Sequence, residues 1–350
     1  MEKIGKYIYG IINSNTNFHL YASENSGEVE RVYTVPYQDI SAIVSDTKIV
    51  DYTHMLKDVL ARQLIRHQRV IERIMNLEHT IIPVRLGTFV LEEGEVIDIL
   101  DKGYGLVKDI IKKISNKIEV DVTAIWDDFP SLLKEIGEEK EIKEFKEHLL
   151  NDPKGITIDD QMKIGFMLKK IVDKKREEYA IQIQETLKSV SHDFKMYELM
   201  DDKMVVNAAF LVDKDKREEF DKKVEDLNAK FNEKLNFRCV APLPPYSFYT
   251  LEIKTVKNEE IDWAKKKLGI LNDITGKDEI RKAYQRQAFS THPDKNPNNP
   301  CAGREFDEVN KAYKILADYC VVLEQANQQD KALFDKEIFR ENAILVRVRE

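Results

Sequence analysis

Hydrophobic and polar positions follow two different periods in the first third of the chain, and each period predicts one kind of element. Stretches that alternate with a period of two are typical of strands, and here they are 6–12, 28–37, 39–46 and 79–90. Pro83 in the last stretch suggests an edge strand or a bulge. Apolar residues three and four apart predict amphipathic helices at 54–77 and 94–115. The apolar face of the first helix is expected to comprise Leu56, Leu60, Leu64, His67 or Gln68, Ile71, and Ile74 or Met75.

The next part of the chain repeats this alternation of strands and helices without repeating the residues. Period-two stretches predict strands at 117–127, at 203–212 and, broken by prolines, at 237–253. Charged amphipathic stretches predict helices at 129–150, 157–190 and 214–235. Alternating strands and helices of these lengths indicate the α+β class. We expect two ferredoxin-like α+β domains, 1–116 and 117–254.

From about residue 259 the pattern becomes helical and stays so to about 340. Apolar stripes predict helices at 277–290 and 303–320, the first opened by a capping-box-like Thr275 and Asp278. The segment between them, "FSTHPDKNPNNP", is polar and rich in proline, so the two helices should form an antiparallel hairpin with an exposed tip. A short helix at 261–270 is expected to close the core through Trp263, Leu268 and Ile270.

The last residues of the chain, "AILVRVRE", read as a short strand in the tail 323–350. Such a strand can join a sheet of its own chain or a sheet of a partner. The first choice needs no second molecule and is the one we expect.

Composition then narrows the classes of function. Charged residues make up 34% of the 350 residues and the formal net charge is -8, whereas binding to the nucleic-acid backbone needs a concentrated basic surface. No apolar run reaches the roughly 18 residues of a membrane-spanning helix. The three cysteines form no CxxC pair, which argues against a disulfide framework and a zinc site. A cytoplasmic protein that binds no nucleic acid and no metal is expected.

Motifs of the common enzyme classes are also missing from the sequence. It contains no GxGxxG, no GxxxxGK[ST], no GxSxG and no HExxH. We therefore expect a non-enzymatic protein with no catalytic residue and no cofactor.

The predicted helix at 277–290 carries a basic strip beside the exposed tripeptide His292, Pro293 and Asp294. The strip consists of Lys277, Arg281, Lys282 and Arg286, which recur at about one helical turn. A basic strip of this kind suits docking on an acidic partner surface, because long-range attraction speeds the encounter. Taken alone the tripeptide is weak evidence, since a Pro-Asp turn is an ordinary way to end a helix. Because the tripeptide lies between two predicted helices that form a hairpin, a purely structural turn is much the less favoured interpretation.

The segment from 259 to 320 resembles the DnaJ (J-domain) family. The phrases that carry the resemblance are "LGI", "DEIRKAYQRQA", "HPDKNP" and "FDEVNKAYKILAD", which occur in the family's order. The resemblance implies that His292, Pro293 and Asp294 trigger ATP hydrolysis by a DnaK-type chaperone. It further implies that the chaperone is contacted by Arg281, Lys282, Arg286 and Lys295.

Two departures from the J-domain pattern lie beside the tripeptide. Gln287 stands where the family usually has an apolar residue, and Thr291 replaces the usual aromatic before the histidine. They bear on helix packing and on affinity for the chaperone. The chain also lacks the Gly/Phe-rich linker and the CxxCxGxG repeats of the larger DnaJ proteins, so any choice of client should lie in residues 1–254.

Residues 4–254 resemble the gas vesicle protein family GvpL/GvpF. Three ordered phrases carry this resemblance: "YIYGI", "HQRVIERIMNLEHTIIPVRLGT" and "APLPPYSF". Leu86 stands where the family tends to have Phe, and Ala241 where it tends to have Gly. The resemblance implies two α+β domains in a minor, non-enzymatic protein that is needed to assemble gas vesicles and contacts the small shell protein GvpA.

Arg85, Glu72 and Tyr246 in these phrases are candidates for a client contact or for a structural role. Arg85 is more simply a structural arginine that holds a turn through a carboxylate such as Glu72. Tyr246 and the prolines around it more simply form a rigid break in an edge strand than a polyproline ligand. His67 is interpreted as a packed or capping histidine, since no second ligand lies at metal spacing.

The two resemblances together suggest a cytoplasmic, gas-vesicle-associated protein that binds or positions GvpA and recruits a DnaK-type chaperone. One alternative is a minor structural or nucleation component with a degenerate J-like interaction domain. The other is a generic J-domain co-chaperone for different clients.

Overall fold

The structure is a computed structural model that describes residues 3–23, 29–50, 52, 55–151, 157–270, 276–297, 299–329 and 343–349. The chain divides into two compact units, and the first of them is assembled from segments far apart in the sequence. It contains Met1–Ile71, Pro83–Ile110 and Thr250–Glu350, and the second contains Glu72–Ile82 and Ile111–Tyr249.

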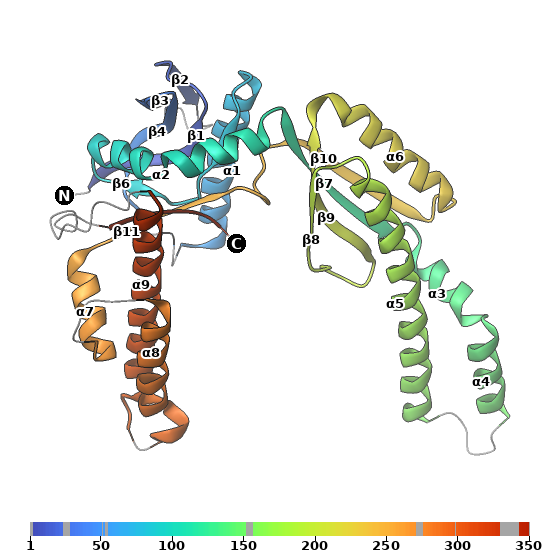
Figure 1. Ribbon diagram of the computed structural model, residues 1–350. Helices are drawn as coiled ribbons and strands as arrows, with labels where there is room; N and C mark the ends of the chain where they lie inside the picture. The colour runs from blue at the N-terminus through green and yellow to red at the C-terminus, as the bar shows by residue number, and fades with distance from the viewer. Residues whose placement is uncertain are drawn as a thin grey trace. The chain divides into compact units, whose positions relative to one another are not determined.

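The first unit is built on an antiparallel sheet and two long helices (Figure 1). The strands are β1 (Ile4–Ile12), β2 (His19–Ser23), β3 (Val29–Tyr37), β4 (Ile40–Lys48), β5 (Ile81–Pro83) and β6 (Phe89–Val90). Their order is β2-β3-β4-β1-β5, and β6 pairs with β1. The helices are α1 (Lys57–Asn76) and α2 (Glu93–Ile114). The last residues of both helices, and Ile81 and Ile82 of β5, are counted with the second unit. Consecutive residues of β1 such as Ile8 and Tyr9 are both buried, so this central strand is covered on its two faces.

The apolar face predicted for α1 is correct only in its second half. His67, Ile71 and Ile74 are buried, whereas Leu56 is 76% exposed and Leu64 is 51% exposed. Helical periodicity shows which side chains share a face, but it does not show how far the surface that covers them extends. The expectation for Leu56 and Leu64 was therefore wrong.

The second unit has a four-stranded antiparallel sheet in the order β10-β7-β9-β8. Its strands are β7 (Lys117–Trp126), β8 (Asp193–Met196), β9 (Met204–Asp213) and β10 (Leu235–Leu243). Three helices lead from β7 to β8, namely α3 (Phe129–Gly137), α4 (Lys140–Leu150) and α5 (Ile158–Lys188), and α6 (Arg217–Lys230) leads from β9 to β10. Each helical connection joins two strands that have another strand between them, which is the split arrangement of ferredoxin-like folds.

The α+β class with antiparallel sheets is confirmed, and the ferredoxin-like strand order is found in the second unit. The first sheet has its own order, because β2, β3 and β4 pair with their neighbours along the chain. The helix predicted at 129–150 is divided into α3 and α4, which are linked by Lys146 Nζ donating to the carbonyl of Gly137 at 3.0 Å.

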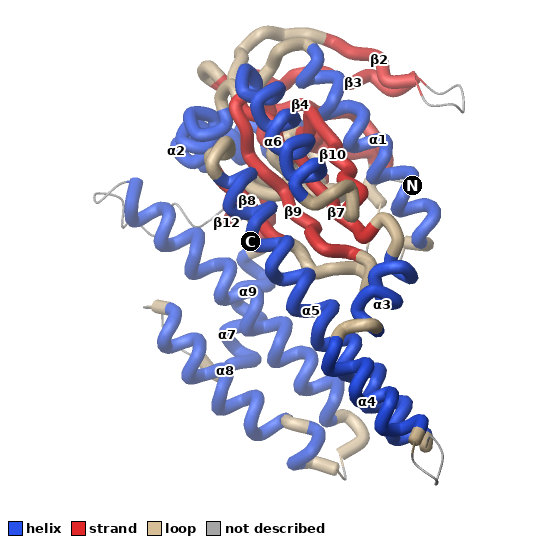
Figure 2. Tube along the Cα trace, turned by 90° about the vertical axis from the view of Figure 1, so that its right-hand side faces the viewer, coloured by secondary structure: helices blue, strands red, loops and turns tan. Residues whose placement is uncertain are grey.

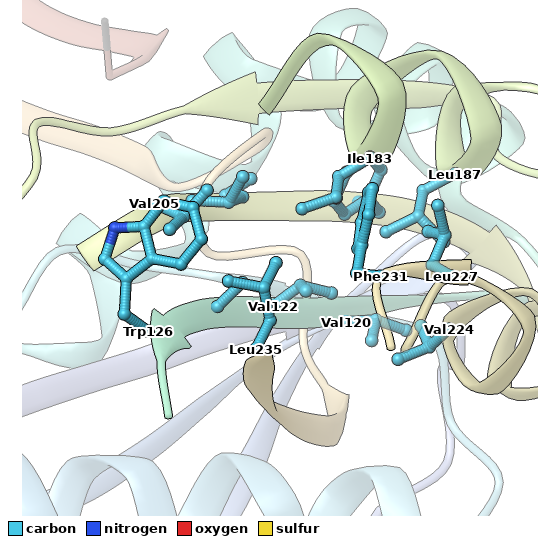
Figure 3. Close-up of a cluster of buried hydrophobic side chains, with 14 of the residues drawn as sticks. Val120, Val122, Trp126, Ile183, Leu187, Val205, Val224, Leu227, Phe231 and Leu235 are labelled. Atoms are coloured by element: carbon cyan, nitrogen blue, oxygen red, sulfur yellow. The ribbon is translucent and has the colours of Figure 1, made fainter. Parts of the chain in front are cut away.

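Alternating side chains of β7 form the core of the second unit (Figure 3). Val120, Val122 and Trp126 point to one face of the strand. There they meet Ile183 and Leu187 of α5 and Val224 and Leu227 of α6, together with Phe231 and Leu235. A strand of period two thus supplies one wall of the core and two helices supply the other.

The remainder of the first unit is a helical hairpin with a short helix beside it (Figures 1 and 2). The helices are α7 (Asn258–Leu268), α8 (Lys277–Thr291) and α9 (Ala302–Gln329). Their shared core includes Ile261, Ala264, Leu268, Ile270, Ile280, Ala283, Val309, Ala312, Leu316 and Cys320. The hairpin predicted from the two apolar stripes is therefore present, and α9 is longer than expected.

Trp263 and Thr275 were expected to close the core of the hairpin and to cap α8. Trp263 does not close the core, because its side chain is 37% exposed and lies against Lys311, while Ile261 and Ala264 take the inward positions. The proposed capping residue Thr275 lies outside the described residues, and α8 begins at Lys277 after Gly276.

The tail contributes a strand to its own chain, as predicted. β12 (Ala343–Val348) pairs antiparallel with β11 (Leu251–Val256), from Leu251 opposite Val348 to Val256 opposite Ala343. The two strands form a separate two-stranded ribbon.

Candidate functional site

The loop between α8 and α9 is held to the end of α8 by side chains of the loop itself. Asn296 Nδ2 donates to the carbonyl of Ser290 at 2.7 Å and to the carbonyl of His292 at 3.1 Å. Pro293–Lys295 form a 3-10 turn directly after His292. These bonds tie the first part of the loop, up to Asn296, to the end of α8 at the tip of the hairpin, at the end opposite to the β11–β12 ribbon (Figure 1).

His292 and Asp294 occupy different environments in this loop. The His292 ring lies edge-on against Phe306 of α9, with centroids 5.2 Å apart, and its Nδ1 accepts the backbone N–H of Asp294 at 3.2 Å. The Asp294 side chain is 90% exposed. The imidazole is thus fixed by the hairpin, and the carboxylate projects into solvent where a cationic partner group can reach it.

The basic residues predicted to contact a partner lie on the outer side of α8. Arg281, Lys282 and Arg286 are exposed, whereas Ile280 and Ala283 on the other side are buried. Within the described part of the chain these three cations form no ion pair.

The remaining basic residues of the predicted set have partners inside the hairpin. Lys277 is bonded to Glu324 of α9 at 2.7 Å and is thereby tied to the hairpin. The ammonium of Lys295 lies over the ring of Phe289.

The two departures Gln287 and Thr291 are accommodated by hydrogen bonds and close packing. Thr291 Oγ1 donates to the Gln287 carbonyl at 2.9 Å, which closes the last turn of α8. Gln287 is half-buried, and its Nε2 lies near Gly269, the left-handed residue that ends α7. The polar residue therefore packs where α7 ends, without opening the core formed by Ile280 and Ala283.

Arg85 holds a carboxylate, as the structural interpretation requires, but the carboxylate is that of Glu252 rather than Glu72. Arg85 Nη1 lies 2.6 Å from Glu252 Oε1 on β11. Glu72 and Arg85 belong to different units of the chain. The pairing was not predictable, because β11 is 167 positions away and nothing local in the sequence points to it.

His67 is a packed histidine, as expected. It is 4% exposed, its Nδ1 lies 2.7 Å from the Tyr7 hydroxyl, and its ring stacks on Tyr9. Burial lowers the pKa of His67 to about 4, so the ring is neutral at pH 7. A cavity of about 640 Å³ opens beside it, between β1, β4 and α1, and is lined by Tyr7, Tyr9, Tyr52, Arg66, His67 and Phe89 among others.

The phrase around Tyr246 covers a buried acidic pair that sequence reasoning missed. The backbone N–H and Oγ of Ser247 donate to the carboxylate of Glu119 at 2.8 and 2.6 Å. Glu119 is 1% exposed, and burial raises its pKa to about 7 and also raises the pKa of Asp121. Tyr246 is half-buried after the edge strand β10, whose pairing with β7 is irregular between Val240 and Leu243. The sequence held one signal of this acidic pair. The two carboxylates lie on the same face of the predicted strand 117–127, the face that meets the turn at Ser247.

Comparison with known proteins identifies the families of both parts. The model of the family described as "Gas vesicle synthesis protein GvpL/GvpF" matches residues 5–250. The chain belongs to the GvpL/GvpF family. Gas vesicle protein F of a Nostoc species is 25% identical over 53% of this chain and 77% of its own length. Gas vesicle protein F1 of Halobacterium salinarum is 24% identical over 71% of this chain and 93% of its own length.

Solved structures support the fold of this GvpL/GvpF chain. The crystal structure of GvpF from Anabaena aligns with a TM-score of 0.59 and 23% identity, covering 70% of this chain and 97% of that one. GvpF from Microcystis aeruginosa aligns with a TM-score of 0.54 and 22% identity. At this identity the similarity concerns the fold alone.

A second family model, the DnaJ domain, matches residues 266–320. The DnaJ chaperone of Paramagnetospirillum magneticum is 41% identical over 59 residues, which are 17% of this chain and 13% of that protein. The likeness is therefore to the J-domain and leaves the rest of DnaJ unmatched. Both families are of non-enzymatic kinds.

Among the described residues, every helix is too short or too polar to span a lipid bilayer. No group of three or more His, Cys, Asp or Glu side chains in that same part of the chain could hold a metal ion.

Proposed function

We propose that this GvpL/GvpF protein delivers a DnaK-type chaperone to the shell protein GvpA during gas vesicle assembly. In this proposal the GvpL/GvpF part binds or positions GvpA. The J-domain recruits the chaperone and stimulates its ATP hydrolysis through His292, Pro293 and Asp294. The protein itself has no catalytic role.

The observation that carries the proposal is the J-domain loop within a chain of the gas vesicle family. The Asp294 carboxylate is 90% exposed at the hairpin tip, and Arg281, Lys282 and Arg286 are exposed on the same helix that leads to it. This exposed cationic side stands out in a chain of net charge -8. It suits docking on an acidic surface with electrostatic steering.

The physical need for a chaperone follows from the wall of a gas vesicle. One face of that wall must repel water, so a subunit that has not yet assembled exposes apolar surface and strand edges. Binding the subunit and the chaperone to one chain raises the local concentration of each for the other. GvpA would thus be kept from aggregation where it is used.

The chaperone contact is tested by binding of the full chain to an ATP-loaded DnaK-type chaperone. Arg281→Glu and Arg286→Glu should weaken binding, and binding by the original chain should weaken as salt rises. Lys314→Glu makes the same change of charge at an exposed lysine of α9 and serves as the control. Equal binding by all of these variants would contradict the docking of α8.

The client contact is tested by retention of GvpA on the immobilised full chain. Retention of GvpA supports the assembly role. Loss of GvpA at every salt concentration, with stimulation of the chaperone intact, would favour a generic co-chaperone. Retention of GvpA without any chaperone binding would favour a structural component with a degenerate J-like domain.

A further inference from the structure

β12 lies outside both family matches, yet it is among the best-packed segments of the first unit. The matches cover residues 5–250 and 266–320, and β12 spans Ala343–Val348. Leu345 is 0% exposed and Val346 is 3% exposed. β12 pairs with β11 along its whole length. A strand buried to this extent is part of the fold and not a loose tail.

The ribbon of β11 and β12 is attached to the sheet-bearing part of the first unit at two places. The Arg85 backbone N–H donates to the carbonyl of Leu251 at 2.9 Å, beside a parallel bridge between Val84 and Leu251. On the other strand, Val346 packs against α2 at Gly103. A Cβ at Gly103 would lie 3.1 Å from a methyl of Val346, so a side chain at this position would require Val346 to shift.

The same ribbon is attached to the J-domain through apolar contacts. Val256 at the end of β11 and Ala343 at the start of β12 belong to the hydrophobic cluster of α7, α8 and α9. The last residue of β11 and the first residue of β12 are thus buried in the core of the helical part.

A cluster of five charged side chains joins these attachments. Glu252 is 10% exposed and bonds to Arg85 at 2.6 Å and to Arg347 at 2.7 Å. Arg347 and Lys254 each reach Asp318 of α9, at 3.2 and 3.0 Å. Burial raises the pKa of Glu252, but Arg347, Lys254 and Arg85 lower it by a larger amount, so the pKa lies below its ordinary value. Glu252 therefore stays ionised at pH 7 and links β11, β12 and the segment of Arg85.

We propose that β12 is a clasp that makes the J-domain a rigid insertion in the first unit. The chain leaves the sheet-bearing part on β11, forms α7 to α9, and returns on β12 to pair with the strand on which it left. A J-domain attached at both ends to one ribbon cannot swing as it would on a single flexible linker. The 292–294 loop is then carried at a fixed position on the unit that also contains the GvpL/GvpF sheet.

Rigid attachment is measurable without any chaperone or client, so this inference can fail independently of the proposed function. Spin labels are placed on the native exposed Cys301 at the loop and on Glu93→Cys at the start of α2, in a Cys239→Ser background. Cys320 is buried and remains. The distance distribution between the two labels is then compared in the full chain and in a chain that ends at residue 342.

The clasp predicts one narrow distance peak for the full chain and loss of that peak in the shortened chain. Far-UV circular dichroism of the shortened chain should retain the helical signal, which shows that the helices are still folded. A broad distribution in the full chain would overturn the inference. So would an unchanged narrow peak after removal of β12.

A milder variant covers the case in which the shortened chain fails to fold. Arg347→Ala should raise hydrogen exchange of the β11 amides towards loop rates, whereas Arg347→Lys should restore only part of the protection, because lysine cannot form the two-pronged contact. Arg304→Ala, which changes an exposed arginine of α9, is the control. Unchanged exchange in Arg347→Ala would show that the charged cluster does not hold the clasp.

Discussion

At the residue scale, the side chains of the J-domain loop differ in their environment. Some of them hold the loop to the hairpin, and one is exposed to solvent. His292 and Asn296 are engaged within the hairpin, while the Asp294 carboxylate stands in solvent. Loss of an exposed carboxylate removes little from the fold. The residues of the tripeptide should therefore differ in what their substitution does to stability.

Asp294→Asn is expected to abolish stimulation of the chaperone and to leave the fold unchanged. Because the side chain is 90% exposed, the free energy of unfolding should change by no more than about 0.5 kcal/mol. Thermal unfolding of the variant, and ATP hydrolysis by the chaperone in its presence, check the two statements. A large drop in melting temperature would show that the carboxylate has a structural role instead.

The buried Glu119 predicts a distinct dependence of stability on pH. Its pKa is about 7 in the folded chain and ordinarily 4.5, so between these values the folded state holds a proton that the unfolded state has lost. Stability should fall as pH rises through this window, by up to about 1.4 kcal/mol per pH unit. Asp121, Tyr197, Tyr246 and Ser247 surround the group, and the pKa of Asp121 is raised as well.

Urea unfolding at pH 5 and pH 8 measures this effect. Glu119→Gln should flatten the dependence and stabilise the protein at pH 8, because an amide keeps the hydrogen bond to Ser247 Oγ without an ionisation cost. Glu218→Gln, at an exposed position in α6, is the matched control. Equal pH profiles for the original chain and Glu119→Gln would contradict the assignment.

At the residue scale, the sequence predicted whether a side chain is exposed or buried better than it predicted which residues contact each other. Exposure of Arg281 and burial of His67 follow from helical periodicity and are observed. The partner of Arg85 and the Glu119–Ser247 contact join residues more than 100 positions apart, and one sequence alone contains no record of such contacts.

At the element scale, β12 packs closely on α2 at one glycine, Gly103. Gly103→Leu should destabilise the first unit by about 1–3 kcal/mol, since the added side chain meets Val346. Gly94→Leu on the same helix has open space around it and gains a similar helix propensity. Chemical unfolding gives the free energy of unfolding of each variant, and the difference between them measures the steric overlap of the new side chain with Val346. Equal stabilities of the two variants would contradict close packing of β12 on α2.

The elements that periodicity missed are short strands at or near sheet edges. β8 has four residues, mostly exposed, and β2 has five, so neither shows enough alternation to predict a strand. The end strand β12 was predicted because its apolar residues form a continuous run, but its pairing with β11 was not. Which strand pairs with which is decided by long-range contacts and not by the local pattern.

At the scale of the whole molecule, the chain joins a GvpL/GvpF protein and a J-domain. Two resemblances in separate sequence segments predicted this combination, and the family matches confirm it. The sequence placed the J-domain after the gas vesicle part. In the structure the J-domain helices lie, along the chain, between β11 and β12, and both strands belong to the first unit. Contact with GvpA and with a chaperone remains a proposal.

Single-turnover ATP hydrolysis by a DnaK-type chaperone, measured with and without GvpA, tests whether this chain delivers the chaperone to GvpA. We expect the full chain to accelerate hydrolysis, GvpA to increase the acceleration, and His292→Gln to return the rate to that of the chaperone alone. Hydrolysis that is the same with the full chain, with His292→Gln and with no addition would contradict it.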